Sequence, residues 1–278
     1  WTPPETGPRL DDADFFAALD LERPGLERVR SAVANGDFRA AKGAFADYLR
    51  QRREPRWFFD WRQRPRFGER PDGVNTEAAD KILAHLLTSC GIPHQFGEDI
   101  DWSINPTKLQ YKEWTWQLIR HPFWKTLGRA YWDTGDETYA REFVYQMTDW
   151  VTDNPVPLNS SGNSAGSRWR TIETGIRMLS SWPDSFFRFL SSPSFADDAL
   201  ILMVKSMVEH ARHLASHPTR NNWLAMEMNG LFHVGVLFPE FRDAEAWRQM
   251  AVTRLYAEME QQVYPDGAQI ELSTGYHG

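Results

Sequence analysis

Apolar residues recur every three to four positions along most of the chain, which is the spacing that places them on one face of an α-helix. Runs that alternate apolar and polar residues, the pattern of a half-buried strand, are absent. The spacing therefore predicts an all-α protein built from antiparallel helix pairs. The helices are expected at residues 11–19, 25–33, 38–50, 76–90, 113–133, 137–153, 168–190, 195–215, 223–237 and 243–263.

Turn residues and irregular stretches separate these helices. Thr134-Gly135-Asp136 predicts a tight αα-hairpin, and Pro122 predicts a kink or break in the helix that contains it. Three stretches lack helical spacing and are expected as loops. They are residues 52–75, rich in Arg, Pro and Trp, residues 91–109, and the Gly/Ser-rich residues 159–167.

At 278 residues the chain is long enough to bury a sizeable core. We divide it into N-terminal helices with a wrapping loop, residues 1–75, and a catalytic helical portion, residues 76–278, as parts of one continuous domain. The net charge of −7 and an isoelectric point near 5.7 argue against a nucleic-acid partner. They do not exclude a polyanionic substrate, because a locally basic cleft can coexist with a negative total charge.

Several other classes of protein are excluded. No apolar run reaches the ~18 residues that a membrane span needs, and no signal peptide is visible. Cys90 is the only cysteine, which excludes an intrachain disulfide and a thiol-rich metal site. It follows an apolar stretch, so we expect its thiol to be buried. No phosphate-binding Gly-rich loop or Gly-x-Ser-x-Gly elbow occurs, and nothing signals an oligomeric state.

Thirteen tryptophans make the chain rich in aromatic residues. Large helical proteins use Trp to fill their cores, but Trp faces also stack on sugar rings. Four of these residues cluster in the sequence, which favours a groove lined by aromatic side chains. They are Trp102, Trp114, Trp116 and Trp124.

A pair of asparagines precedes the predicted helix at 223–237. Asn221 and Asn222 lie directly before Trp223. Either Asn can cap the helix, but only one can do so, which leaves the other free at a helix N-terminus, a place suited to anions. Glu227 follows among apolar residues, as expected where a helix lines a functional cavity.

Basic residues cluster in two further places. Arg120 and His121 directly precede a proline, and a helix break there would expose groups that can line a site. Arg170, Glu173 and Arg177 have spacings that place them on one helix face. That face is either a solvated set of ion pairs or a basic strip that binds uronate or sulfate groups.

Two more groups leave alternatives open. His210, His213 and His217 have the spacing of metal ligands, but no paired carboxylate accompanies them, which favours a solvated helix face. Acidic residues supply candidates for the carboxylate pair of a glycosidase. They are Asp99, Asp101, Glu113, Asp266 and Glu271.

Tyr276 and His277 directly precede the last residue, Gly278. A tyrosine can shuttle a proton, provided that nearby cations or hydrogen bonds lower its pKa from about 10. In an extended segment the two side chains face opposite ways, so we expect Tyr276 to be catalytic, with His277 and Glu271 in supporting positions. An amide such as that of Asn222 can bind a carboxylate without repelling it. Together these are the groups needed to remove a proton next to a sugar carboxylate.

Three blocks resemble the heparinase II/III-like polysaccharide lyases, closest to the heparinase III branch. They are Asn221-Asn222-Trp223 through Gly230-Leu231, then Phe238-Pro239-Glu240, and Pro265-Asp266-Gly267 with Glu271-Leu272-Ser273-x-x-Tyr276-His277. The Arg120-His121-Pro122 segment and the N-terminal helices are also similar to that family. The resemblance implies an α/α toroid, incomplete in this chain and followed in the full protein by a β-sandwich domain.

The resemblance also implies roles for individual residues. Tyr276 would be the acid/base, and Asn222 would neutralise the uronate carboxylate. Many relatives carry His directly after this Asn, where this chain has Trp223. Relatives also contribute a histidine, and often a divalent metal, from the sandwich domain, so we expect no metal or cofactor in this chain. The expected substrate contacts are Arg120, His121, Asn221, Trp223, Glu227, Trp116 and Arg170.

We therefore expect a periplasmic or secreted lyase that cleaves uronate-containing polysaccharide, with heparan sulfate or a heparin-like glycosaminoglycan favoured, by β-elimination. Two alternatives remain from the residues alone. One is an inverting glycoside hydrolase with an Asp/Glu pair, and the other is a carbohydrate-binding α/α domain without activity.

Overall fold

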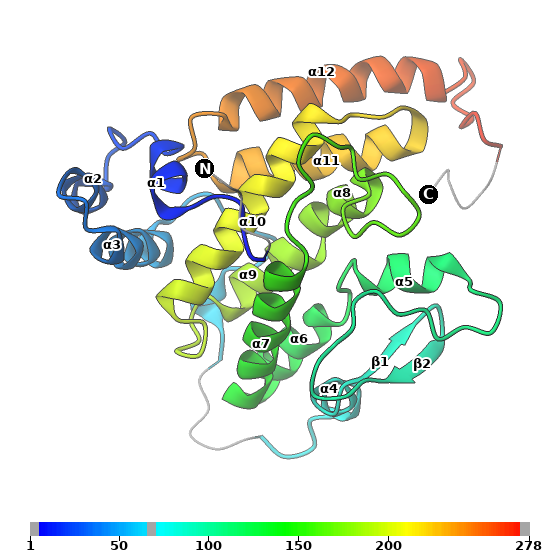
Figure 1. The fold of residues 1–278 in the computed structure, drawn as a ribbon, viewed down its shortest axis with the longest axis horizontal. Coiled ribbons are helices and arrows are strands. Elements are labelled where there is room, and N and C mark those ends of the chain that lie inside the picture. Colours follow the sequence, from blue (N-terminus) through cyan, green and yellow to red (C-terminus); the bar gives the residue numbers. More distant parts are fainter. Residues whose placement is uncertain (1–5, 66–70, 273–278) are drawn as a thin grey trace.

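The computed structural model describes residues 6–65 and 71–272, and Figure 1 shows that most of them are helical. The predicted all-α class is confirmed, with one short hairpin added. The elements are α1 (Asp12–Ala17), α2 (Glu27–Ala34), α3 (Phe38–Gln51), the 3₁₀ helix η1 (Trp61–Gln63), α4 (Glu77–Leu83), β1 (Leu86–Ser89), β2 (Ile92–Gln95), α5 (Lys112–Leu118), α6 (Trp124–Thr134), α7 (Glu137–Asp153), α8 (Thr171–Leu179), α9 (Ser181–Phe189), α10 (Asp197–Ser216), α11 (Asn221–Leu237) and α12 (Ala244–Gln262).

The helix predicted over residues 76–90 is wrong in its second half. Helix α4 ends at Leu83, and β1 pairs with β2 in an antiparallel register that joins Leu86 to Gln95 and Ser89 to Ile92. The loop between the strands is Cys90-Gly91, and both residues have positive φ angles, 50° and 74°. Two consecutive positive φ angles are the geometry of a tight hairpin turn. The side chain of Cys90, which we expected to be buried, is only half-buried.

The ranges 113–133 and 168–190, each expected as one helix with a kink or break only at Pro122, are both broken in two. Between α5 and α6, His121 takes a positive φ of 54°, and Pro122 follows it. Between α8 and α9, Ser180 has φ −134° and ψ −94°, outside the helical region. The break before Pro122 was expected, because proline lacks the N–H that a helix interior needs.

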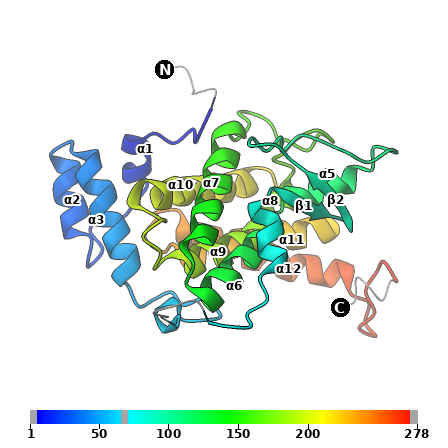
Figure 2. The same cartoon turned by 90° about the horizontal axis from the view of Figure 1, so that it is seen from below.

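The helices pack into one layered body with two distinct ends (Figures 1 and 2). The N-terminal helices α1–α3 lie at one end, where α3 packs against α10. The β1–β2 hairpin and α5 lie at the other end. Residues 6–65 share the main core, since Leu19 bridges to Phe241 and Arg52 pairs with buried Glu240 at 2.7 Å. Within the described ranges no helix is both long and apolar enough to cross a membrane.

Helices α8 and α11 cross at two glycines. A Cβ atom at Gly175 would lie 2.5 Å from the Met226 carbonyl oxygen, and one at Gly230 would lie 2.5 Å from the Gly175 carbonyl oxygen. No real Cβ comes this close to a backbone oxygen, so only glycine allows the two backbones to approach this closely. The close approach therefore lies between the middle of α8 and residues 226–230 of α11.

We expect Gly230→Ala to lower the free energy of unfolding by about 1–3 kcal/mol, because the added methyl group must push two helix backbones apart. The matched control is Gly97→Ala, where an added Cβ would meet nothing within 4 Å. That change should shift stability by no more than about 0.5 kcal/mol. Equal unfolding midpoints for the two variants in urea would contradict the close packing described above.

Candidate active site

Arg170, which was expected to contact substrate, lies between Trp116 and Trp223 where α5, α8 and α11 converge. The guanidinium carbon of Arg170 lies 3.5 Å from the centre of the Trp116 ring and 4.8 Å from that of Trp223. The cation is therefore held between two indole faces, each of which attracts it. Both tryptophans are half-buried, so part of each ring faces solvent.

Glu173 contacts both Arg170 of this stack and a second arginine, Arg120. Its carboxylate is fully buried and accepts a hydrogen bond from Arg120 at 2.9 Å, while Arg170 Nε lies 3.4 Å away. Arg120, Arg170 and the buried Arg177 outnumber Glu173 and the nearby Glu113, which leaves a net positive charge beside Trp116. Burial lowers the pKa of Arg170, and Glu173 opposes that shift. The group is an internal ion cluster, which corrects the expectation of a solvated face. Only the Arg120 side chain, 23% exposed, reaches solvent to any extent.

Arg177 fixes the backbone on both sides of the cluster. It is fully buried and donates to the carbonyl oxygens of Ile119 at 3.2 Å and Arg168 at 3.1 Å. These carbonyls lie next to Arg120 and close to Arg170, so one guanidinium sets the position of both cationic residues. It also donates to His210 Nε2 at 2.9 Å. Burial lowers the pKa of Arg177 to about 9, which keeps it charged at neutral pH.

The Gly/Ser-rich loop of residues 159–167 lies against this cluster and is held from two sides. Trp116 Nε1 donates to the Ala165 carbonyl at 3.0 Å. His213 Nε2 lies 3.1 Å from the Ser161 carbonyl and 3.0 Å from the Trp169 carbonyl. Carbonyls only accept, so the His213 hydrogen is on Nε2. The expectation of a solvated histidine face is wrong here, since His210 and His213 are both buried.

This burial predicts acid lability. Burial lowers the pKa of His213 to about 4, and the nearby His217 adds to the shift. A folded-state pKa below the unfolded value of about 6.5 gives stability that is present above pH 6.5 and is lost as pH falls towards 4. We expect the difference in melting temperature between the parent protein and His213→Gln to narrow across that window. Gln keeps a donor for the two carbonyls but cannot take up a proton. A difference in melting temperature that stays the same at every pH would contradict this role for His213.

The first turn of α11 leaves the Asn222 side-chain amide without a hydrogen-bond partner among the described residues. The N-cap residue is Arg220, which makes no side-chain capping bond, so neither Asn caps the helix through its side chain. The Asn221 N–H donates to the buried Glu258 carboxylate at 2.8 Å, with φ of 59° at Asn221. The Asn222 side chain is half-buried and makes no hydrogen bond to any other residue within the described ranges. Since it lies in the first turn of a helix, a partial positive charge surrounds it.

Two residues expected to touch substrate lie beneath the surface. Glu227 is fully buried, and its two oxygens accept from the Thr219 N–H at 2.8 Å and the Thr219 hydroxyl at 2.7 Å. His121 is fully buried, stacks on Trp124 at 4.1 Å and accepts from Trp182 at 3.1 Å. Burial, followed by the Arg177 charge, holds the pKa of His121 well below its usual value. We therefore assign both residues a positioning role in place of the expected substrate contact.

Helix α12 brings the chain back to the Asn222 end of α11. Its start packs on the end of α11, where Gly235 faces Ala244, and its last turns reach Asn221 through Glu258. The two helices are therefore antiparallel, as Figure 1 shows. The chain then turns through Val263 and Gln269, which form a bridge, to the exposed Glu271. Tyr276 and His277 lie outside the described residues.

Other expected groups are not brought into the cluster. Trp102, Trp114 and Trp124 are core residues, each 2% exposed or less, so of the four tryptophans expected to line a groove only Trp116 is not buried. The Asp99 carboxylate groups with two others that the sequence did not suggest, Asp149 and Asp153, all within 4.8 Å. Burial first, and then these like charges, raise the pKa of Asp149 to about 6. Within the described part of the chain, these three carboxylates form no hydrogen bond or ion pair with Arg120, Arg170 or Arg177.

The chain is similar to a known family over most of its length. The family model described as heparinase II/III N-terminus matches residues 15–278. The chain belongs to the heparinase II/III family. The resemblance seen in the Asn221–Trp223 and Pro265–His277 blocks is thereby confirmed.

Relatives within this family are similar over nearly the whole chain. A heparin-sulfate lyase of Pedobacter heparinus is 37% identical over 94% of this chain and 40% of its own length. The corresponding lyase of Bacteroides stercoris is 33% identical over 95% of this chain and 41% of its own length. The chain thus spans about two fifths of the length of the curated relatives that it matches.

Solved structures of this family share the fold. The heparan sulfate lyase HepC from Pedobacter heparinus matches with a TM-score of 0.76 and 38% identity, over 95% of this chain and 42% of that one. A crystal structure of heparinase III matches with a TM-score of 0.83 and 25% identity, over 96% of this chain and 41% of that one. The expected toroid fold of the helical portion is confirmed by these matches.

Proposed function

We propose that this heparinase II/III chain is the helical portion of a lyase that cleaves uronate-containing polysaccharide, with heparan sulfate as the favoured substrate, by β-elimination. The observation that carries the proposal is the Asn222 amide in the first turn of α11, which has no hydrogen-bond partner in residues 6–65 and 71–272 and lies one residue before Trp223 in the Arg170 stack. The site thus combines a neutral donor for a carboxylate with a net positive cluster for an acidic sugar.

In the proposed reaction the Asn222 amide donates a hydrogen bond to the uronate carboxylate. Removal of the C5 proton then builds negative charge that spreads into this carboxylate. A preorganised donor at that point stabilises the transition state more than the ground state. The C5–H bond breaks, the C4=C5 bond forms, and the C4–O4 bond breaks, with a proton delivered to the leaving O4. We assign the proton transfers to Tyr276.

Arg120, Trp116 and Trp223 are the residues that we propose to hold the sugar chain. The two half-buried indoles offer apolar faces, and the partly exposed Arg120 offers a cation beside them. Glu173 keeps Arg120 oriented, since the 2.9 Å hydrogen bond fixes one end of its guanidinium. The buried Glu227 holds Thr219 through two hydrogen bonds, and so fixes the turn that precedes Asn222. Because polysaccharide of this kind lies outside the cell, we also propose a periplasmic or secreted location.

The test is a panel of uronate polymers incubated with the protein while ultraviolet absorbance is followed. Elimination leaves a conjugated C4=C5 bond that absorbs, whereas hydrolysis and simple binding leave none. We expect absorbance to rise with heparan sulfate and to stay flat with a neutral glucan. Cleavage of heparan sulfate without any rise in absorbance would favour a hydrolase, and absence of cleavage would favour a binding domain.

A further inference from the structure

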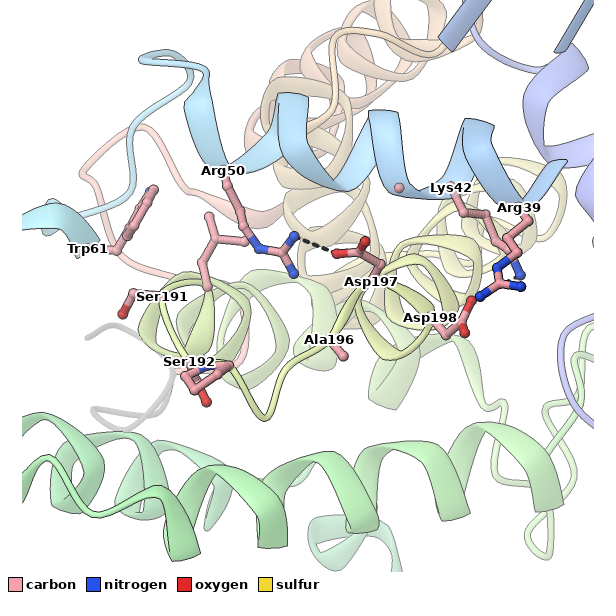
Figure 3. A pocket seen from close by; sticks show the side chains of 12 residues that line it. Arg39, Lys42, Arg50, Trp61, Ser191, Ser192, Ala196, Asp197 and Asp198 are labelled. Atoms are coloured by element: carbon pink, nitrogen blue, oxygen red, sulfur yellow. Dashed lines mark hydrogen bonds and ion pairs between the residues drawn. The ribbon is translucent and has the colours of Figure 1, made fainter. Parts of the chain in front are cut away.

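Two pockets adjoin at Trp61, far from the candidate active site. The first has a volume of about 700 Å³ and lies between α3 and the start of α10 (Figure 3). The second, about 640 Å³, is formed by residues 49–62 together with Phe187. Trp61 lines both of them, and we name the two pockets together the Trp61 site.

The Trp61 site is basic although the chain is acidic overall, with a net charge of −7. Three carboxylates line it: Asp60, Asp197 and Asp198. They face a larger number of cations, which includes Arg39, Lys42, Arg50, Arg53, Arg56 and Arg62. A local excess of one sign in a concave surface attracts ligands of the opposite sign.

Part of this charge is fixed in place and part is free. Arg50 donates to Asp197 at 2.6 Å and to the Phe195 carbonyl at 3.0 Å, and Figure 3 shows it held over the start of α10. Lys42 pairs with Asp198 at 3.0 Å. Arg39 and Arg53 are exposed and form no ion pair with any described residue. One of these two uncompensated cations lines each pocket.

Aromatic side chains complete the recess. Phe58 is 86% exposed, a high value for a ring with no polar group. Trp61 is half-buried and carries the Arg62 guanidinium 4.6 Å from its ring centre. Exposed rings among arginines offer a face for a sugar ring together with bidentate donors for its sulfate or carboxylate groups.

The Trp61 site is too distant to belong to the candidate active site. Helix α10 begins at the first pocket with Asp197 and reaches the other site near its end, where His213 holds the 159–167 loop. Its 20 residues correspond to about 30 Å. A short oligosaccharide bound at Asn222 cannot touch both places, whereas a polymer can.

We propose that the Trp61 site is a second binding site for acidic polysaccharide, which retains a polymer while the Asn222 site cleaves it. The ligand class rests on the proposed function, but the existence of an anionic-glycan site here does not require cleavage. Binding is electrostatic in large part, so it weakens as salt rises.

The test is the double variant Arg39→Glu/Arg53→Glu, which reverses the two free charges, one in each pocket. The matched control is Arg129→Glu/Arg141→Glu, two exposed arginines of α6 and α7 that line neither pocket. Binding of heparan sulfate polymer is measured by titration calorimetry at low salt in an Asn222→Asp background, and turnover of a short oligosaccharide is measured with Asn222 present. Phe58→Ser tests the aromatic part, and this exposed ring can be removed without loss of the core.

We expect the Arg39/Arg53 variant to bind the polymer about fivefold or more weakly, since exposed charge contacts are individually small but two are reversed. The control variant should bind as the parent does, and oligosaccharide turnover should not change. Equal binding by parent and variant, an equal loss in the control, or no polymer binding by the parent would each overturn the proposal. If no variant cleaves any polymer but the Arg39/Arg53 change still weakens binding, the Trp61 site stands and the proposed lyase activity fails.

Discussion

Asn222→Asp is expected to lower kcat by at least ~10²-fold while leaving the fold as stable as before. Loss of one preorganised donor costs about 10²- to 10³-fold in turnover, and Asp adds a negative charge beside the carboxylate where charge develops. Asn222→Ala loses the donor without adding charge, so its kcat should fall less than that of Asn222→Asp. Because Asn222 does not cap α11, and an acidic residue is favourable in a first helical turn, the Asp variant should melt at or slightly above the parent temperature.

The adjacent Asn221→Asp variant is the control for this experiment. Asn221 is exposed and its role in the structure is a backbone one, through the N–H bonded to Glu258. Asp tolerates a positive φ much as Asn does, so a modest effect is expected. An Asn222→Asp protein with near-parent turnover would remove Asn222 from the reaction.

Tyr276→Phe is expected to lower kcat by at least ~10²-fold with little change in KM, because the phenolic hydroxyl is assigned both proton transfers and no binding contact. The matched control is Tyr264→Phe, a partly exposed tyrosine in the same returning segment after α12. It should retain parent activity. Similar losses in the two variants would point to a general sensitivity of this segment, and unchanged turnover in Tyr276→Phe would exclude the tyrosine as acid/base.

Local sequence patterns predict most of the fold. The long helices α7, α10, α11 and α12 follow from apolar spacing, and the α6–α7 turn follows from Gly135, which has a φ of 72°. The β1–β2 hairpin could not be predicted, because its turn is Cys90-Gly91 and its strands are only four residues each. The break at Ser180 carries a proline signal that the helical spacing obscured, because Pro183 lacks the N–H that a continuous helix would need and is tolerated in the first turn of α9.

Some features of the candidate site could also be predicted from the sequence, and others could not. Asn222, Trp223 and the arginines could be found, because each belongs to a short motif or a helical spacing. The burial of this group could not be predicted, because its partners are far apart in the sequence. Glu173 and Arg120 are 53 positions apart, and Arg177 and His210 are 33 positions apart. A helix face that carries two arginines and a glutamate looks solvated in sequence. Only long-range packing makes it an internal cluster that aligns the groups at the surface.

The most direct test of the central claim is the mass of the products from one defined heparan-sulfate oligosaccharide, cleaved in water labelled with heavy oxygen. Elimination breaks the C4–O4 bond without adding water. We therefore predict two fragments whose masses sum to that of the substrate, one of them unsaturated and neither containing heavy oxygen. Fragments that together exceed the substrate by one labelled water would show hydrolysis, and would contradict the assignment of Asn222 and Tyr276 to a β-elimination.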